Sequence, residues 1–495
     1  MSAPDLLLAI DQGTTSTRAI AFDYHLRPVA SASRSLRTRH PQPGWFEQDA
    51  EHILESVVAT VERVIAEIGG PGRIAAAGLD NQGETVVAWD AESGQAVAPA
   101  ILWQCRRSLP VVESLRAAGL EPRIRATTGL PLDPYFSAGK MTWLLEHHDG
   151  VQKAAQRGTL RMGTVDAWLT AQLDGGDART DASTASRTQL FSLTDLTWNR
   201  ELLDWFGIDP AVLPRVVASA GELGMIEHPR WGGAMPLRAM ACDQQAGLAG
   251  QAGFAAGAMK ATLGTGAFIL ANAGTRPPVA PSLEASVAWI LADGRPSFVL
   301  QGGVFAAGSF ISWLRDDLGV IRDAAELSRL AGSVPDSGGL RVLPAPAGLG
   351  APWWRPEART VLAGASGGTG RGHLARATLD GIANLMVDVL EVMAEALPAA
   401  APALRVDGGL ASSPFLVQRL ADLWGRPIDV AGAIESTALG IAGLAGLGAG
   451  IVGMETIAAA NPIRDRVEPG LASGERGDER ASWRRFVQST AGLGT

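Results

Sequence analysis

The chain has 495 residues, which is enough for two or more domains at about 100–200 residues each. Its 42 Lys+Arg and 51 Asp+Glu give a formal net charge of −9 without a basic run, which argues against nucleic-acid and anionic-membrane binding. Cys105 and Cys242 are its only cysteines and fit neither a zinc pattern nor a disulfide framework, so we expect a cytoplasmic protein.

The N-terminal residues predict a β-hairpin with a polar tip. Residues 6–10 (LLLAI) and 18–22 (RAIAF) read as strands, and DQGTTST between them carries acid, amide and hydroxyl groups. The pattern recurs at 259–263 and 267–271 around Gly-Thr-Gly, and a third glycine turn (DGGLASS) follows a strand at 404–406. Ordinary turn chemistry explains any one of these turns. All three in this order suggest duplicated α/β lobes whose turns hold phosphate.

Helical periodicity is clear at 51–68, 305–318 and 373–397, so strands and helices are interspersed as in α/β proteins. Residues 247–259 are rich in glycine and alanine and suit either a hinge between lobes or close helix packing. The apolar run 438–454 is glycine-rich and short for a membrane span, which predicts a packed internal helix.

The stretch 78–89 (GLDNQGETVVAW) places acid and amide groups between two apolar strands. Polar groups at the mouth of an apolar sheet are typical of a site for a small hydroxylated ligand. Common nucleotide motifs are missing, because there is no G-x-x-x-x-G-K-[ST] and GAGIVG at 448–453 lacks a strand-turn-helix context. A nucleotide would therefore bind through another architecture.

Several motifs, taken together, resemble the FGGY family of carbohydrate kinases, and within it the glycerol kinases. They include AIDQGTTSTRAIAFD, GWFEQD, DPYFSAGKMTWLLEH at 133–147, DQQAGLAGQ, LGTGAF and RVDGGLASS. The resemblance covers essentially the whole chain. It implies an α/β fold of two actin-like (ribonuclease H-like) ATPase lobes around a central cleft. We place the lobes at 1–247, with the acceptor site, and 248–495, with the nucleotide site.

The resemblance implies ATP- and Mg²⁺-dependent phosphorylation of a small polyol, with glycerol giving sn-glycerol 3-phosphate. Phosphoryl transfer needs in-line positioning and a base for the hydroxyl proton, and Asp243 matches that base. A helix N-cap is an alternative role for Asp243. The acceptor site matches Gly83, Glu84, Trp103, Tyr135, Asp243, Gln244 and Phe268. Asp11 is expected to hold the hydrated Mg²⁺. The nucleotide site matches Thr14, Thr15, Ser16, Arg18, Gly264, Thr265, Gly308, Ser312, Gly409 and Ser413.

Three positions depart from the glycerol kinase pattern. Gly83 stands where an arginine is usual, and Ser312 and Ser413 replace Gln and Asn. Losing a charged donor costs about 1.5–3 kcal/mol per hydrogen bond. Either Arg106, Arg107 or a water replaces the guanidinium, or the vacated volume admits a longer polyol or a ketose of the erythritol, ribulose or xylulose type.

Two other classes of function remain open, a non-catalytic sensor and an actin-like filament, although the acceptor-site residues disfavour both. The expected partners are a small polyol and further copies of the chain, as a homodimer or homotetramer. No nucleic-acid or membrane partner is expected.

Overall fold

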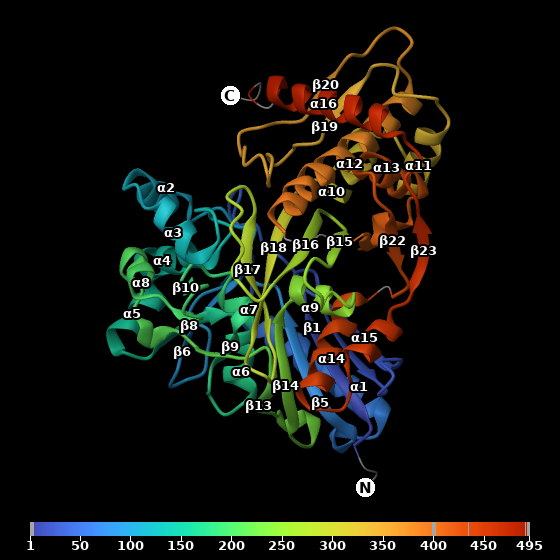
Figure 1. Cartoon of the computed structure of the whole chain (residues 1–495). Coiled ribbons are helices and arrows are strands. Elements are labelled where there is room, and N and C mark those ends of the chain that lie inside the picture. The colour runs from blue at the N-terminus through green and yellow to red at the C-terminus, as the bar shows by residue number, and fades with distance from the viewer. Residues whose placement is uncertain (1–3, 398–401, 434, 491, 493–495) are drawn as a thin grey trace.

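The computed structural model describes residues 4–397, 402–433, 435–490 and 492, so both ends of the chain, 1–3 and 493–495, lie outside the described residues. Two large mixed sheets dominate it and lie in the lower and upper halves of Figure 1. The lower sheet has the order β13 (Ala220–Ile226), β14 (Met235–Cys242), β5 (Ile74–Asn81), β1 (Leu6–Gln12), β2 (Ser16–Phe22), β3 (Pro28–Ser35). The upper sheet has the order β17 (Glu284–Ile290), β18 (Pro296–Val304), β16 (Ala267–Gly274), β15 (Met259–Leu263), β21 (Leu404–Asp407), β22 (Ile428–Ala431), β23 (Ile463–Val467).

The two sheets repeat one topology. In each, a hairpin strand (β1 or β15) pairs antiparallel with its partner (β2 or β16) on one side and parallel with a later strand (β5 or β21) on the other. A second parallel strand (β14 or β22) and then an antiparallel edge strand (β13 or β23) follow. The two predicted hairpins therefore open equivalent sheets, as the sequence pattern suggested.

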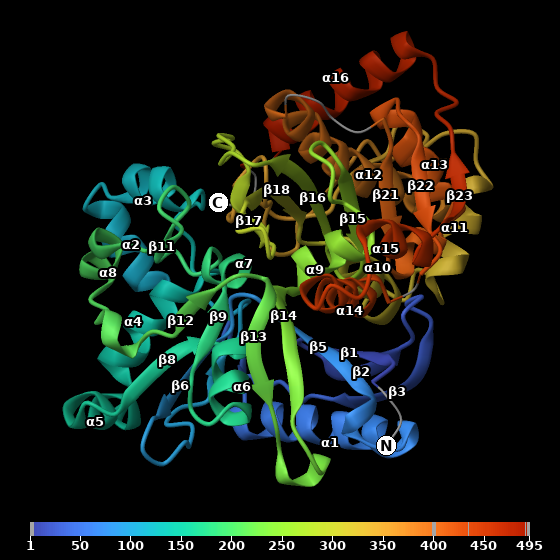
Figure 2. The same ribbon diagram turned by 60° about the horizontal axis from the view of Figure 1, so that its bottom comes forward.

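A third, smaller sheet and a group of helices lie to one side of the lower sheet (Figures 1 and 2). The sheet has the order β4 (Glu47–Gln48), β7 (Ala100–Ile101), β6 (Val86–Asp90), β8 (Leu160–Thr164). The helices are α2 (Leu109–Ala117), α3 (Glu121–Thr128), α4 (Ser137–His147), α5 (Asp149–Arg157) and α8 (Arg200–Phe206). They share one hydrophobic core with β6 and β8, so this part of the chain forms a separate packing unit beside the first sheet.

Long helices cover the sheets, and their ends follow local sequence signals. In α1 (Ala50–Ile68), the Asp49 carboxylate caps the first turn and Gly69 ends the helix in the left-handed conformation, with φ of 88°. In α13 (Pro414–Trp424), Ser413 caps the N-terminus. Apart from α9 and α14, described below, the other α-helices are α6 (Val165–Leu173), α7 (Ala182–Ala185), α10 (Gly308–Asp316), α11 (Ala324–Gly332), α12 (Arg371–Ala396), α15 (Met454–Ala460) and α16 (Ser473–Thr490). The remaining strands are β9 (Arg179–Asp181), β10 (Phe191–Ser192), β11 (Thr197–Trp198), β12 (Arg215–Val217), β19 (Arg341–Leu343) and β20 (Val361–Ala363).

Two glycine-rich helices, α9 (Asp243–Gly250) and α14 (Ser436–Gly448), cross between the sheets. A Cβ at Gly250 would lie 1.9 Å from the Ser436 carbonyl oxygen, and one at Gly440 would lie 1.8 Å from that of Ala246. Only glycine permits this approach, because any side chain would overlap the facing backbone. The hydrophobic cluster around the two helices includes residues of β1 and β14 from one sheet and of β16 and β18 from the other.

The predicted internal helix at 438–454 is confirmed as α14, although it ends at Gly448 and α15 begins at Met454. Of the glycines in 247–259, Gly250 permits the close packing of the two helices. Within the part of the chain that the structure describes, no helix has both the length and the apolar character needed to cross a bilayer. One expected helix starts later than predicted. α10 begins at Gly308 instead of residue 305, because β18 continues to Val304 and a turn follows it.

Candidate active site

The polar run that interrupts the strands forms the connection between β5 and β6. Gln82 links this connection to the β1–β2 hairpin, because its N–H donates to the Gln12 carbonyl (3.0 Å) and its Oε1 accepts from the Thr14 hydroxyl (3.3 Å). The Thr85 hydroxyl also donates to Oε1 of Gln82, at 2.9 Å. The run therefore holds two loops together at the ends of paired strands, next to a cavity.

This cavity has a volume of about 70 Å³ and receives residues from both large sheets. All seven residues expected at the acceptor site line it: Gly83, Glu84, Trp103, Tyr135, Asp243, Gln244 and Phe268. The other lining residues are Thr14, Gln82, Arg187, Cys242 and Gln301. Residues separated by up to 287 positions in the sequence, from Thr14 to Gln301, thus meet at one small site.

Aromatic side chains form one wall of the cavity. The rings of Trp103 and Tyr135 pack edge to face, with centroids 5.6 Å apart and planes at 81°. The indole Nε1 of Trp103 donates to the Thr14 hydroxyl at 2.9 Å, which fixes this wall to the tip of the first hairpin. The wall offers apolar surface to the carbon atoms of a ligand, beside polar groups that can bind its hydroxyls.

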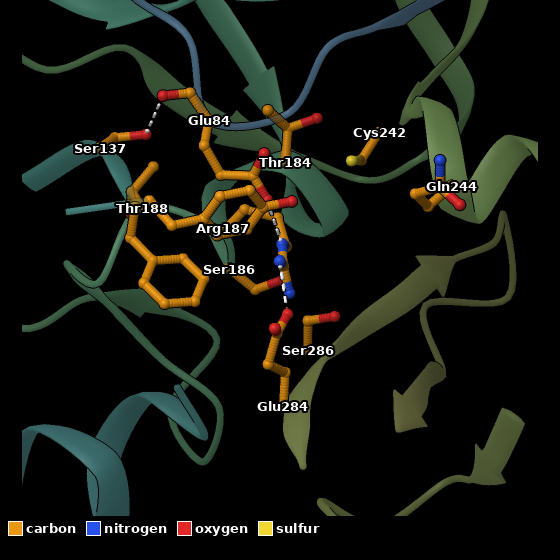
Figure 3. A network of polar contacts seen from close by, with 12 residues as sticks. Glu84, Ser137, Thr184, Ser186, Arg187, Thr188, Cys242, Gln244, Glu284 and Ser286 are labelled. Carbon is orange, nitrogen blue, oxygen red and sulfur yellow. Dashed lines mark hydrogen bonds and ion pairs between the residues drawn. The ribbon is translucent and has the colours of Figure 1, made fainter. Parts of the chain in front are cut away.

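A buried ion-pair chain lies against the same cavity (Figure 3). Arg187, just after α7, donates through Nε to Oε1 of Glu84 and through Nη2 to Oε2 of Glu284 on β17, both at 2.7 Å. The side chains of all three are nearly inaccessible, at 1% for Arg187 and 6% for each glutamate. Burial raises the pKa of Glu284, and the charge of Arg187 opposes that rise. These two ion pairs join the first lobe to the second.

The space beside Gly83 is already filled. A Cβ built on Gly83 would lie 2.5 Å from Sγ of Cys242, which is closer than real Cβ contacts. The expectation that glycine vacates room for a longer acceptor is therefore wrong at this point, because the Cys242 side chain occupies that room.

The two arginines that were expected to replace the missing guanidinium do not line the cavity. Arg106 is exposed, and its neighbour Arg107 pairs with Glu47 at 2.7 Å and stacks on Trp45, with 4.0 Å between Cζ and the ring centroid. A different arginine, Arg187, reaches the site instead.

Asp243 is the first residue of α9, and Cys242 occupies the N-cap position that was an alternative role for the aspartate. Oδ1 of Asp243 accepts a hydrogen bond from the backbone N–H of Gln244 at 2.7 Å. Burial raises the pKa of Asp243 to about 6, the charge of Glu84 adds to the rise, and the charge of Lys260 opposes it. The carboxyl is thus ionised at neutral pH while remaining basic enough to accept a proton.

Asp11 and Asp80 lie side by side on the paired strands β1 and β5, where they are partners in the register. Asp80 is fully buried, and neither of its carboxylate oxygens has a hydrogen-bond partner among the described residues. Burial raises the pKa of both carboxyls, and for Asp80 the charges of Asp11 and Asp243 raise it further. Two adjacent buried acids are costly even though the charge of Arg18 lowers the pKa of Asp11, and a divalent cation would relieve that cost.

The two hairpin turns expected to hold phosphate are built by local hydrogen bonds. The N–H of Gly13 donates to the Ser16 carbonyl at 3.0 Å, and that of Gly264 to the Gly266 carbonyl at 2.9 Å. The N–H of Gly308 donates to the Gly264 carbonyl at 3.0 Å, and a Cβ there would lie 2.5 Å from the same oxygen. Glycine at 308 therefore lets the start of α10 rest directly on the second turn.

Arg18, expected at the nucleotide site, forms an ion pair with Glu435 just before α14. The pair connects β2 of the first sheet to the segment that leads into the helix between the sheets. The side chains are 31% and 42% exposed, so solvent weakens the interaction. Arg18 is thus held by a carboxylate in this conformation.

A second, larger cavity of about 470 Å³ lies in the upper lobe between α11, α12 and the turn before α13. Gly409 and Ser413, both expected at the nucleotide, line it together with Ile311 of α10. Gly308 and Ser312 share α10 with Ile311 but do not line the cavity. The Ser413 hydroxyl donates to that of Ser328 at 3.1 Å and caps α13, so its short side chain is already engaged.

Residues 6–250 match the N-terminal domain, and residues 259–449 the C-terminal domain, of the FGGY family of carbohydrate kinases. The chain belongs to this family. FGGY kinases of known structure share its fold. A glycerol kinase of Plasmodium falciparum with ADP superimposes with a TM-score of 0.93 at 28% identity over 99% of both chains. A xylulose kinase of Lactobacillus acidophilus superimposes with a TM-score of 0.88 at 22% identity over 99% of this chain and all of that one. The expected two-lobed actin-like fold is confirmed.

Curated relatives of this FGGY kinase match it along its whole length. A protein of Citrifermentans bemidjiense named glycerol kinase is 44% identical over 490 residues, which cover 99% of each chain. A protein of the same name from Symbiobacterium thermophilum is 44% identical over 98% of each chain.

Sequence reasoning missed four residues that this FGGY kinase places at the acceptor cavity or against it: Arg187, Glu284, Cys242 and Gln301. No local pattern identifies them, because each contact joins distant segments. Arg187 is the only charged residue in the stretch TASRTQLFSL (184–193), and that isolated charge was the one signal available in the sequence.

Proposed function

We propose that this FGGY kinase transfers the terminal phosphoryl group of ATP to glycerol and forms sn-glycerol 3-phosphate. The observation that carries the proposal is the convergence of Glu84, Trp103, Tyr135, Gln244 and Phe268 on one cavity that also contains Asp243. The two full-length relatives named glycerol kinase support the same acceptor.

The size of the cavity favours a small acceptor. A cavity needs a volume of about 10–15 Å³ to hold one water molecule. The acceptor cavity, at about 70 Å³, therefore accommodates a few groups of that size. Glycerol, with three carbons and three hydroxyls, suits this volume better than a five-carbon ketose. The filled space beside Gly83 supports the same choice, so the alternative of a larger polyol or ketose is not favoured.

In the proposed mechanism, Asp243 accepts the proton of the attacking hydroxyl through its carboxylate. Glu84 accepts hydrogen bonds from the other hydroxyls, and Gln244 orients the acceptor beside the base. The aromatic wall packs on the acceptor carbons and excludes water, which would otherwise compete as a nucleophile. Alignment of the attacking hydroxyl with the phosphorus atom lowers the activation barrier further.

The nucleotide is proposed to bind with its adenosine in the cavity beside Gly409 and Ser413. The phosphates then extend toward the two hairpin turns, where N–H and hydroxyl groups can bind them. The proposed phosphate ligands are Thr14, Thr15, Ser16, Arg18, Gly264 and Thr265. Gly308 and Ser312 contribute through the position of α10, because they lie outside the cavity lining.

Magnesium fits the pair Asp11 and Asp80. Mg²⁺ commonly takes one or two carboxylates together with water and substrate phosphates, so two carboxylates are enough. Among the described residues there is no larger metal site, that is, no group of three or more His, Cys, Asp or Glu side chains that could hold a metal. When bound, the ion neutralises phosphate charge during transfer. Asp11 and Asp80 would hold it from the ends of β1 and β5. A cytoplasmic location and a homodimer or homotetramer stay predictions.

The direct test measures glycerol phosphate formed from ATP and glycerol by the purified protein and by Asp243→Asn. We expect turnover by the unaltered protein and a loss of about 10²- to 10⁴-fold in the variant. ADP binding, measured by calorimetry, should be preserved in the variant. Absence of glycerol phosphate with the unaltered protein would overturn the proposed function.

A further inference from the structure

Arg187 combines burial with an unused hydrogen-bond donor at the acceptor cavity. Nε and Nη2 bind Glu84 and Glu284, while Nη1 is buried without a hydrogen-bond partner among the described residues. The guanidinium lies against Tyr135 and Phe136, with Cζ 5.7 and 5.2 Å from the ring centroids. Leaving a buried donor without a partner is unfavourable, and a hydrogen bond to a bound hydroxyl would remove that cost.

Among the described residues, no second cationic side chain lines the acceptor cavity. Arg187 is the only Lys or Arg among the residues that line this cavity. The nearby Lys260 is occupied, because its Nζ donates to Oε1 of Gln244 at 2.9 Å and to the Thr262 hydroxyl at 3.0 Å. The Nζ of Lys140 donates to the backbone carbonyls of Tyr135 and Phe136.

The loop that carries Gly83 cannot supply the donor either. The Cβ of any side chain at position 83 would overlap Sγ of Cys242, and it would lie 3.7 Å from Cγ of Arg187. Arg187 and Cys242 therefore pack against the face that a side chain at 83 would have filled. Arg187, which follows α7 in the sequence, lines the cavity instead.

The charges around Arg187 keep its guanidinium protonated. Burial lowers the pKa of Arg187, but the charges of Glu284 and Glu84 outweigh it and raise the pKa well above its ordinary value. The two ion pairs also fix the planar group in one orientation. A guanidinium fixed in this way can donate to an acceptor hydroxyl without first losing side-chain freedom.

We propose that Arg187 is a specificity-determining residue that donates a hydrogen bond through Nη1 to a hydroxyl of glycerol that is not phosphorylated. Arg187 thereby supplies, from the segment after α7, the cationic donor that the 82–85 loop lacks. Glu84 binds both Arg187 and the acceptor, and Glu284 brings the second lobe into the same network. The inference rests on the proposed function, since it assigns part of the glycerol site.

The test compares Arg187→Lys with the unaltered protein on glycerol, 1,2-propanediol and 1,3-propanediol. Each diol lacks one hydroxyl of glycerol. We expect the variant to lose about 10- to 100-fold in kcat/KM on glycerol and much less on the diol without the bonded hydroxyl. The KM for ATP should stay unchanged. An equal loss on all three acceptors would overturn the proposal, because a merely structural role lowers every activity alike.

Arg107→Lys is the matched control. Arg107 is also buried, ion-paired and left with one unpartnered nitrogen, Nη2, but it lies outside the cavity lining. We expect this variant to keep the unaltered preference for glycerol over both diols. The same loss of preference in Arg107→Lys would also contradict the proposal.

A folding defect is separated from a binding defect by a second variant. The double variant Arg187→Gln/Glu284→Gln removes one charge of each sign, so only Glu84 loses its partner. We expect it to show the same selective loss on glycerol, with a cooperative thermal transition. If the unaltered protein neither binds nor phosphorylates glycerol, the proposed function fails and this inference fails with it. If the unaltered protein acts on glycerol and both variants lose activity uniformly, the inference alone fails.

Discussion

The Sγ atom of Cys242 lies 2.5 Å from the point where a Cβ at Gly83 would stand. The two residues are separated by 159 positions and belong to different walls of the acceptor cavity. Their side chains compete for one volume, so position 83 can carry a side chain only if position 242 gives way. This relationship sets the size of the cavity and predicts how the two positions respond to substitution.

The first prediction concerns this steric pair. Gly83→Ala should lower the free energy of unfolding by about 1–3 kcal/mol, because the new methyl group overlaps Cys242 in a packed interior. In a Cys242→Ala background, the same change should cost much less. Urea unfolding of the two single variants and the double variant measures the coupling. Gly367→Ala, where no atom lies within 4 Å of the new Cβ, is the control. Strictly additive effects would contradict the overlap.

The second prediction is a pH dependence set by Asp243. Burial raises its pKa to about 6, and a general base acts only when ionised, so activity should be lost as pH falls. We expect kcat/KM for glycerol to be level above about pH 7 and to fall about tenfold per pH unit well below pH 6. A profile of kcat/KM at saturating ATP measures this. A level profile down to pH 4.5 would contradict the role of Asp243 as base.

The third prediction concerns Asp80. Asp80→Asn removes one of two adjacent buried acids, so it should raise the melting temperature of the metal-free protein. It should also weaken Mg²⁺ binding by about 10- to 100-fold, measured as the melting-temperature shift across a Mg²⁺ titration with ADP present. Asp166→Asn is a matched control, because Asp166 is equally buried with one unpartnered oxygen but lies outside both cavities. An unchanged response to Mg²⁺ in Asp80→Asn would show that Asp80 does not contact the ion.

The fourth prediction concerns the ion pair between Arg18 and Glu435. If Arg18 binds the transferred phosphate, it must first leave the carboxylate. Glu435→Gln should therefore tighten binding of ATP, measured by calorimetry, by about 1.5- to 5-fold, which corresponds to the 0.2–1 kcal/mol of an exposed ion pair. Glu455→Gln, at an exposed position on α15, serves as a control. Weaker ATP binding in Glu435→Gln would instead show that Glu435 supports the nucleotide site.

Local patterns were sufficient to predict the frame of the site. Strand β15 has the residues expected for it, and the first hairpin differs from the prediction by only two residues at the inner end of each strand. Alternation and turn composition determine such hairpins, so they can be found in a single sequence. The gathering of Glu84, Tyr135 and Phe268 was predicted through the family resemblance, since no local rule brings these positions together.

The partners of Arg187 could not be predicted in this way. Glu84 and Glu284 lie 103 and 97 positions from it, and their contact depends on how the two lobes meet. The overlap between Gly83 and Cys242 is likewise a property of the packed cleft. The expectation of free space at Gly83 was wrong because a glycine in the sequence shows only a missing side chain and not what fills its place.

The most direct test of the central claim is the ratio of kcat/KM values for glycerol and for larger acceptors. ADP formation by the unaltered protein is measured with glycerol, dihydroxyacetone, erythritol, xylitol, ribulose and xylulose at saturating ATP. A small cavity closed by Cys242 and equipped with Arg187 predicts that glycerol gives the highest kcat/KM and that five-carbon acceptors are poor substrates. A five-carbon acceptor with a higher kcat/KM than glycerol would contradict the account.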